Sequence, residues 1–147
     1  MNMMKRRIIT IILAALIVFC FTGCTIANPT VLNEKMVAML DLSVQRDTES
    51  RFALLYPGVT DEDTYRSTAQ QIDEYFPVTE GYTWELQQWH ITKSITISSV
   101  VYEGQYKVGF DGKVFYLLVI WRSDSGGEGF TKFQVISEEE WVAANNK

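Results

Sequence analysis

The pattern of hydrophobic and polar positions divides the chain into an apolar leader, a helical part and a β-rich part. The leader is an apolar run over residues 8–21 that follows three basic residues, Lys5, Arg6 and Arg7. At 1.5 Å per residue, a helix of about 15 residues spans about 22 Å, which is less than the roughly 30 Å hydrocarbon core. Basic residues before a short apolar segment are typical of an export signal, so we expect residues 1–23 to be removed.

Three amphipathic helices are predicted after the leader. Apolar residues recur at helical spacing over residues 29–45, with Asn28 as the expected cap. A shorter helix begins after a cap at Asp47 or Thr48. A third helix covers residues 60–76 and has one apolar stripe, at steps of four, three and four, formed by Tyr65, Ala69, Ile72 and Phe76.

From residue 82 onward, β-branched and aromatic residues replace the helical spacing, which predicts sheet. Residues 82–97 form one long or two short strands, and the first hairpin turns either near Ser98-Ser99 or at Gly104. Alternation along the first strand predicts two faces, with Trp89, Ile91, Ile95 and Ile97 on one and Trp84, Leu86, His90 and Thr92 on the other.

The second half of the predicted sheet carries clearer local signals. Asp111-Gly112 supplies the two positive-φ positions of a type I′ turn between two strands. Residues 114–122 are apolar at nearly every position, so we expect a central strand that is covered on both faces. A last strand follows at residues 129–136, and Ser137 with Glu140 predicts the capping box of a short terminal helix.

The leader ends in Phe21-Thr22-Gly23-Cys24, which resembles the lipobox of bacterial lipoproteins, with Phe21 in place of the usual Leu. The resemblance implies that Cys24 receives a diacylglycerol thioether and becomes the mature N-terminus. Residues 24–28 are then the lipidated cysteine and a short tether, and residues 29–147 form a single domain. We expect this domain to be anchored on the extracytoplasmic face of the cell membrane.

Helices followed by an antiparallel meander predict an α+β fold in which the helices pack on one face of the sheet. This order over residues 29–136 resembles the nuclear-transport-factor-2-like fold, and with the lipobox it is similar to uncharacterised Gram-positive lipoproteins of that type. The resemblance implies a cone of three N-terminal helices on a curved sheet of about four strands. It also implies a pocket between helices and sheet, or dimerisation through the outer sheet face. Because such folds include isomerases, dehydratases and binding modules, the fold leaves the function open.

Charge and cysteine content restrict the partners. Removing the leader leaves 10 basic against 18 acidic residues, a net charge of −8. Such a domain repels phosphate backbones, so no nucleic-acid partner is expected, and membrane attachment rests on the lipid. Cys20 leaves with the leader and Cys24 is lipidated, so no thiol remains for a disulfide, a nucleophile or a metal site.

Candidate catalytic and metal-binding residues are few. His90 is the only histidine and has no identifiable partner, so we expect it at a pocket rim or on the sheet surface. The acidic runs at residues 61–63 and 138–140 lie at predicted helix starts, where they favour the positive end of the helix dipole. Ser125-Gly126-Gly127 lacks the flanking pattern of a nucleophile elbow or phosphate loop. We therefore predict no catalytic residue, metal or cofactor.

Aromatic residues offer a second candidate surface. If several aromatic residues share the outer face of the sheet, that face would bind a protein partner or a second copy of the chain, unless the terminal helix and loops cover it. The residues concerned are Tyr102, Tyr106, Phe115, Trp121 and Phe133. The sequence thus predicts a lipid-anchored binding or interaction module with an unknown ligand. The alternatives are a small isomerase-like or dehydratase-like enzyme with its site in the cone, and a purely structural envelope protein.

Overall fold

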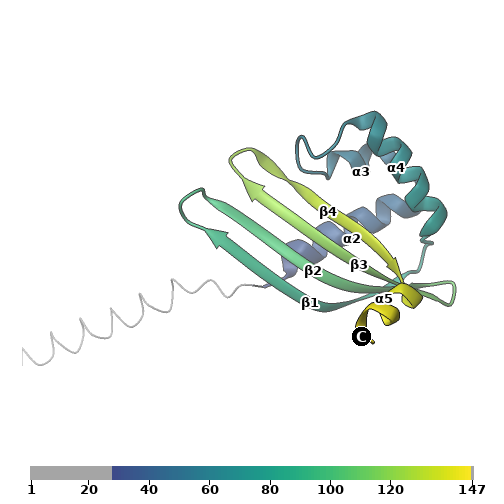
Figure 1. Ribbon diagram of the computed structural model, residues 1–147. Coiled ribbons are helices and arrows are strands. Elements are labelled where there is room, and N and C mark those ends of the chain that lie inside the picture. The colour runs from purple at the N-terminus through teal and green to yellow at the C-terminus, as the bar shows by residue number, and fades with distance from the viewer. Residues whose placement is uncertain (1–27, 147) are drawn as a thin grey trace, which may run out of the picture.

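The computed structural model describes residues 28–146, so the predicted leader, the lipobox and Cys24 lie outside the described residues. Within this part of the chain, three helices precede a four-stranded sheet, and a terminal helix follows it (Figure 1). The elements are α2 (Thr30–Val44), α3 (Thr48–Ala53), α4 (Glu62–Tyr75), β1 (Thr83–Ser94), β2 (Ser99–Phe110), β3 (Lys113–Asp124), β4 (Gly127–Ser137) and α5 (Glu138–Asn145). None of these helices is long and apolar enough to span a bilayer.

The sheet is an antiparallel meander in which each strand pairs with the next along the chain, in the order β1-β2-β3-β4. The predicted α+β class, with helices first and an open four-stranded meander after them, is confirmed. Asp111 (φ 50°) and Gly112 (φ 70°) form the predicted turn between β2 and β3. The first hairpin turns at residues 95–98, so Gly104 lies inside β2.

Local hydrogen bonds fix the helix starts. The carboxylate of Asp47 accepts from the Ser50 amide at the start of α3. Asp61 accepts from the Thr64 amide, so α4 begins at Glu62, two residues after the predicted start at residue 60. Ser137 and Glu140 form the predicted capping box of α5. These bonds satisfy backbone N–H groups that have no partner within the helix.

The second helix, α3, ends at Ala53, and the residues that follow it pair with the sheet. The Phe130 amide donates to the Leu54 carbonyl at 2.9 Å, and the Tyr56 amide donates to the Phe130 carbonyl at 3.0 Å. Gly129 allows this approach, since a Cβ there would lie 2.2 Å from the Tyr56 nitrogen. The connection between α3 and α4 is therefore tied to the outer edge of the sheet.

The core lies between α2 and one face of the sheet, which we call the inner face. In β3 this face carries Phe115, Leu117, Val119 and Trp121, all buried. Gly104 in β2 makes room for the helix, because a Cβ there would lie 2.6 Å from Leu32 Cδ2. The buried helical side chains that meet this face include Leu32, Met36, Met39 and Leu40.

The opposite face of the sheet, the outer face, has no second layer over its middle. Tyr116, Leu118 and Ile120 of β3 are only half-buried there, so the prediction that this strand is covered on both sides is wrong. Only α5 lies over one end of this face, where the Trp141 ring stacks on Tyr116 with centroids 4.5 Å apart and planes 10° apart. The outer face is therefore open between α5 and the hairpin ends.

Candidate functional site

The outer face contains a hollow of about 600 Å³, which we call the outer trough. Every strand contributes to it, and its side chains come from the outward-pointing positions of the register. These residues are Gln88 and His90 from β1, Glu103 and Gln105 from β2, Leu118 and Ile120 from β3, and Lys132 from β4. A site drawn from four paired strands has a rigid base, because each position is fixed by the ladder on either side.

A β-bulge brings the β1 residues to this face. The register of β1 against β2 shifts between Leu86 and Gln88, so that Gln88 lies opposite Gln105 and His90 opposite Glu103. Strict alternation predicts Trp84 and Leu86 on the same face as His90, and this prediction is wrong. The bulge adds one residue to β1, so even-numbered residues point to the inner face before it and to the outer face after it. Trp84 instead packs edge-on against Tyr106 on the inner face, with centroids 5.9 Å apart.

Two rows of side chains run across the trough. In the first row, the register places His90 beside Glu103, Glu103 beside Ile120, and Ile120 beside Lys132. In the second row, the same pairing gives Gln88, Gln105, Leu118 and Gln134 in that order. Each row therefore has polar groups at its two sides and an aliphatic residue of β3 as its floor.

The polar side chains of the trough are not engaged with one another. Within residues 28–146, His90, Glu103 and Lys132 make no side-chain hydrogen bond and no ion pair, and all three are exposed. A carboxylate, an imidazole and an ammonium group therefore point from a partly apolar surface toward solvent. Such a mixture of apolar floor and a few polar groups is typical of small-molecule sites.

The structure places the residues that were predicted to form an interaction surface on the inner face. Tyr106 (0% exposed) and Trp121 (2% exposed) are buried on the inner face, so their predicted place on the outer face is wrong. Phe115 is buried there too, and Tyr102 and Phe133 pack against the same core. The reason is that α2 packs on the face of β2 and β3 that carries the aromatic rings. His90 is exposed on the sheet surface and lines the outer trough.

Sequence reasoning missed the other trough residues. Glu103, Gln105 and Lys132 are separated by up to 29 positions and carry no spacing motif. A signal was present in residues 114–122, since a strand that is apolar on both faces either lies between two layers or exposes one apolar face. The structure shows the second case, and Leu118 and Ile120 form the exposed apolar floor.

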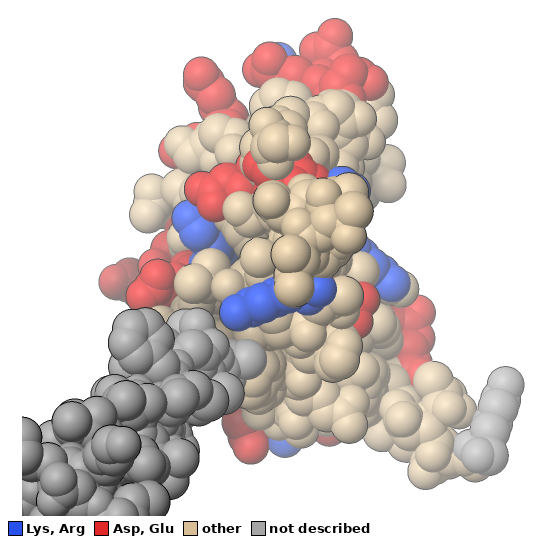
Figure 2. Space-filling model, turned by 90° about the vertical axis from the view of Figure 1, so that its left-hand side faces the viewer, with Lys and Arg blue, Asp and Glu red and all other residues tan. Residues whose placement is uncertain are grey.

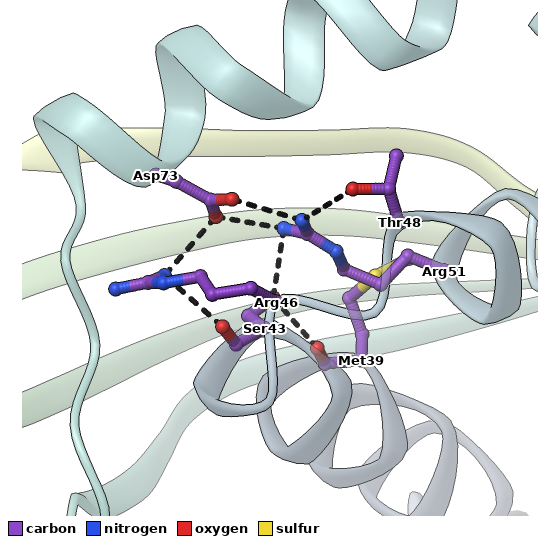
Figure 3. A network of polar contacts seen from close by, with 6 residues as sticks. All are labelled: Met39, Ser43, Arg46, Thr48, Arg51 and Asp73. Atoms are coloured by element: carbon purple, nitrogen blue, oxygen red, sulfur yellow. Dashed lines mark hydrogen bonds and ion pairs between the residues drawn. The ribbon is translucent and has the colours of Figure 1, made fainter.

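A second polar cluster lies between the three N-terminal helices (Figure 3). The Arg51 guanidinium, 1% exposed, donates to both carboxylate oxygens of Asp73 at 2.8 and 2.9 Å. Arg46 also donates to Asp73, at 3.1 Å, and Thr48 accepts from Arg51 at 3.3 Å. Arg46 donates as well to the Ser43 carbonyl of α2, at 3.0 Å. Because these bonds connect the end of α2 with α3 and α4, we interpret the cluster as a structural clamp.

Two smaller hollows lie beside α4, of about 190 and 330 Å³. Their walls are mainly apolar, with Ile72 and Phe133 common to both, and neither is lined by an Asp, a Glu or a His. Across the described part of the chain, no group of three or more His, Cys, Asp or Glu residues is placed to hold a metal ion. A further hollow of about 340 Å³ lies at α3 and the start of α4, and its lining includes Arg46, Glu49 and Glu62. Among these hollows, the trough is the one to which all four strands contribute and the one lined by a histidine.

Charge is unevenly distributed around the sheet. Figure 2 looks at the end of the sheet that carries the β1–β2 and β3–β4 hairpins. The middle of this view is tan with basic groups, and red carboxylates lie around it, most of them above and to its sides. Within α3 and α4, the first turns alone contain Glu49, Glu62 and Asp63.

Comparison with known proteins gives a fold relationship. No model of a known protein family matches the chain, and no curated protein matches it. One similar solved structure is the 1.8 Å structure of Aln2 from a Streptomyces species, with a TM-score of 0.50 and 11% sequence identity. The likeness covers 81% of this chain and 98% of that chain. At this identity the similarity concerns the fold alone.

Proposed function

We propose that this protein is a non-catalytic binding module, anchored to the extracytoplasmic face of the cell membrane by a lipid on Cys24, that takes its ligand in the outer trough. The observation that carries the proposal is the combination in this hollow of an aliphatic floor with polar side chains that have no partner of their own. Burying the floor under a ligand contributes about 25 cal/mol per Å² of apolar surface.

The order of groups in the first row suggests the ligand class. Glu103 offers a carboxylate at one side, Ile120 an apolar surface in the middle, and Lys132 an ammonium group at the other side. Glu103 and Lys132 are two strands apart, which is about 10 Å at the usual strand spacing. A short peptide fits this order, because its amino group, its side chains and its carboxylate are spaced over a similar length. We propose a peptide-like zwitterion as the ligand.

A binding role suits this arrangement better than the enzyme alternative. The space between helices and sheet is occupied by buried side chains such as Tyr106, Leu117 and Phe130, each 0% exposed. In the trough, His90 and Glu103 are open to solvent, whereas general acid–base groups are tuned by burial and by neighbouring charges. No hydroxyl or thiol nucleophile of the described residues is hydrogen-bonded to His90.

Titration with the tripeptide Ala-Leu-Ala, followed by amide NMR, tests the proposed site. We expect shifts at Gln88, Glu103 and Gln105, and weaker shifts when both peptide termini are blocked. Lys132→Gln should weaken binding about tenfold, because it removes the charge opposite the peptide carboxylate. Glu85→Gln is the matched control, since Glu85 is exposed on β1 but does not line the trough. Shifts confined to the hollows beside α4, or cleavage of the peptide, would contradict the proposal.

The proposed anchor has its own test. The support for it is the basic, apolar and small-residue order of residues 5–24. Intact-mass analysis of the chain extracted from bacterial membranes should show loss of residues 1–23 and a diacylglyceryl group on Cys24. Cys24→Ala should release the domain from the membrane fraction. An unmodified Cys24 that follows a retained leader would contradict the anchor while leaving the trough to be tested separately.

A further inference from the structure

The tip of the β1–β2 hairpin, residues 93–98, carries two highly exposed isoleucines. Ile95 is 96% exposed and Ile97 is 60% exposed. They lie in a four-residue turn at residues 95–98, so neither side chain packs on the sheet. Single exposed apolar residues are ordinary, but two isoleucines at the end of a projecting hairpin contribute nothing to the core.

The surroundings of the isoleucines are polar and weakly basic. Lys93 is exposed next to the turn, and the remaining side chains of the tip are the hydroxyls of Ser94, Thr96 and Ser98. The tip contains no acidic residue, although the full chain has 18. Isoleucines surrounded by hydroxyls and a lysine match the interfacial region of a bilayer, where apolar groups are buried beside polar headgroups.

The position of the tip relative to the start of the domain favours the same partner. In Figure 1 the β1–β2 hairpin points to the left, toward the side on which α2 begins. Asn28, the first described residue, follows Cys24 by only four positions. A fully extended tether of this length spans at most about 14 Å. A lipid on Cys24 would therefore hold this end of the domain against the bilayer. The same end carries the β1–β2 and β3–β4 hairpins and faces the viewer in Figure 2.

We propose that the hairpin tip is a second membrane contact, in which Ile95 and Ile97 enter the interfacial region of the anchoring membrane and Lys93 pairs with anionic headgroups. This inference rests on the proposed lipid anchor, which raises the local concentration of the tip at the membrane and so strengthens a contact made by two side chains. The contact stays at headgroup depth, so the backbone groups of the turn remain hydrated.

Two contacts fix the orientation of the domain, whereas a lipid on a tether leaves it free to rotate. With the hairpin tip at the membrane, the strands rise from the surface and the outer trough opens sideways. The carboxylates of α3 and α4 are then kept away from anionic lipid, which lowers the electrostatic cost for a domain of negative net charge. The trough would remain accessible to a ligand that moves along the membrane.

Spin-label accessibility on the full lipidated chain tests the contact. Ile97→Cys gives one labelling site if Cys20 leaves with the leader and Cys24 carries the lipid. Lys113→Cys is the control, because Lys113 follows the β2–β3 turn at the opposite end of the sheet. On vesicles of phosphatidylcholine and phosphatidylglycerol, oxygen should collide with the label at residue 97 more often than a water-soluble nickel chelate does. At residue 113, the nickel chelate should collide with the label more often than oxygen does.

Hydrogen exchange supplies a measurement that needs no label. Amides of residues 94–99 should exchange at least about twofold more slowly on vesicles than in detergent-free solution, and the protection should be lost in the double variant Ile95→Ser and Ile97→Ser. Equal water accessibility at residues 97 and 113, together with unchanged exchange, would overturn the inference.

Mass analysis of the same samples separates the two proposals. If Cys24 is lipidated and the tip is not protected, the second contact fails and the anchor stands. If Cys24 is unmodified, the anchor fails, and sedimentation of the soluble chain with the same vesicles decides on the tip. The parent chain should then bind more than the double variant Ile95→Ser and Ile97→Ser, and equal binding would overturn the inference.

Discussion

Arg51 and Asp73 lie 22 positions apart in the sequence and form a bidentate ion pair, with Nη1–Oδ1 at 2.8 Å and Nη2–Oδ2 at 2.9 Å (Figure 3). The pair connects α3 to α4, and the Ser43 hydroxyl at the end of α2 lies 3.5 Å from Arg51 Nη1. Arg51 Nε has no hydrogen-bond partner among the described residues. The side chain is thus held by its two terminal nitrogens alone. Its buried charge is neutralised by a single carboxylate and has little contact with solvent.

Loss of that carboxylate should destabilise the domain strongly. Asp73→Asn leaves the buried Arg51 charge without its counterion, and removing one partner of a buried pair costs about 3–5 kcal/mol. Urea denaturation followed by tryptophan fluorescence measures the change. Glu62→Gln is the control, because the Arg66–Glu62 pair is exposed on α4 and such pairs contribute about 0–1 kcal/mol. Equal effects of the two substitutions would show that the clamp is not buried in solution.

Replacing both partners should be less harmful than replacing one. The double variant Arg51→Met and Asp73→Leu removes the desolvated charges together and fills the space with apolar groups. We expect it to recover at least about 1 kcal/mol relative to Asp73→Asn. The same denaturation experiment checks this, and a double variant less stable than Asp73→Asn would assign the cluster a role beyond charge pairing.

Two adjacent leucines of β3 should respond differently to truncation. Leu117 is 0% exposed on the inner face, so Leu117→Ala should cost about 2–5 kcal/mol through lost burial and a cavity. Leu118 is half-buried in the trough floor, so Leu118→Ala should cost clearly less than Leu117→Ala and should instead weaken ligand binding. Denaturation midpoints and the peptide titration measure the two effects. A larger loss of stability at Leu118 would reverse the assignment of the faces.

Gly129 should tolerate no side chain. A Cβ at this position would lie 2.2 Å from the Tyr56 nitrogen and 2.3 Å from the Leu55 carbonyl carbon, both of them backbone atoms. Gly129→Ala should therefore break the bridge between the α3–α4 connection and β4, at a cost of several kcal/mol. Gly58→Ala is the control, because Gly58 has positive φ but no atom within 4 Å of the added Cβ, and should cost about 1 kcal/mol. The melting temperatures of both variants give the comparison.

Stability should fall in acid through surface carboxylates that are hydrogen-bonded in the folded state. The Tyr56 hydroxyl, at 2.7 Å, holds the pKa of Asp124 below its usual value, and the Tyr75 hydroxyl does the same for Glu140. A lowered folded-state pKa contributes stability that is complete above the unfolded-state pKa, about 4, and is lost as the pH falls further. Denaturation midpoints should decline below about pH 4. Tyr56→Phe should make the decline shallower, and an unchanged slope would contradict this assignment.

Local chemistry alone was enough to predict several elements. Asp111 and Gly112 turn the chain because they are adjacent and adopt positive φ at low cost, and Ser137 with Glu140 caps α5 through atoms three residues apart. The order of helices before strands followed from periodicity, which depends on near neighbours. Each of these features is settled within a few residues, so the sequence itself determined it.

The tertiary structure decided which face of each strand became part of the core. Alternation along β3 was visible in the sequence, but both of its faces are apolar, so only the position of α2 could bury Trp121 and leave Ile120 open. The bulge after Leu86 depends on pairing with β2, and it changes the face on which His90 lies. The trough row from His90 through Glu103 and Ile120 to Lys132 takes one residue from each strand. Its composition is a property of strand register, which is fixed by the turns, the bulges and the packed helices together, and no single stretch of the chain contains it.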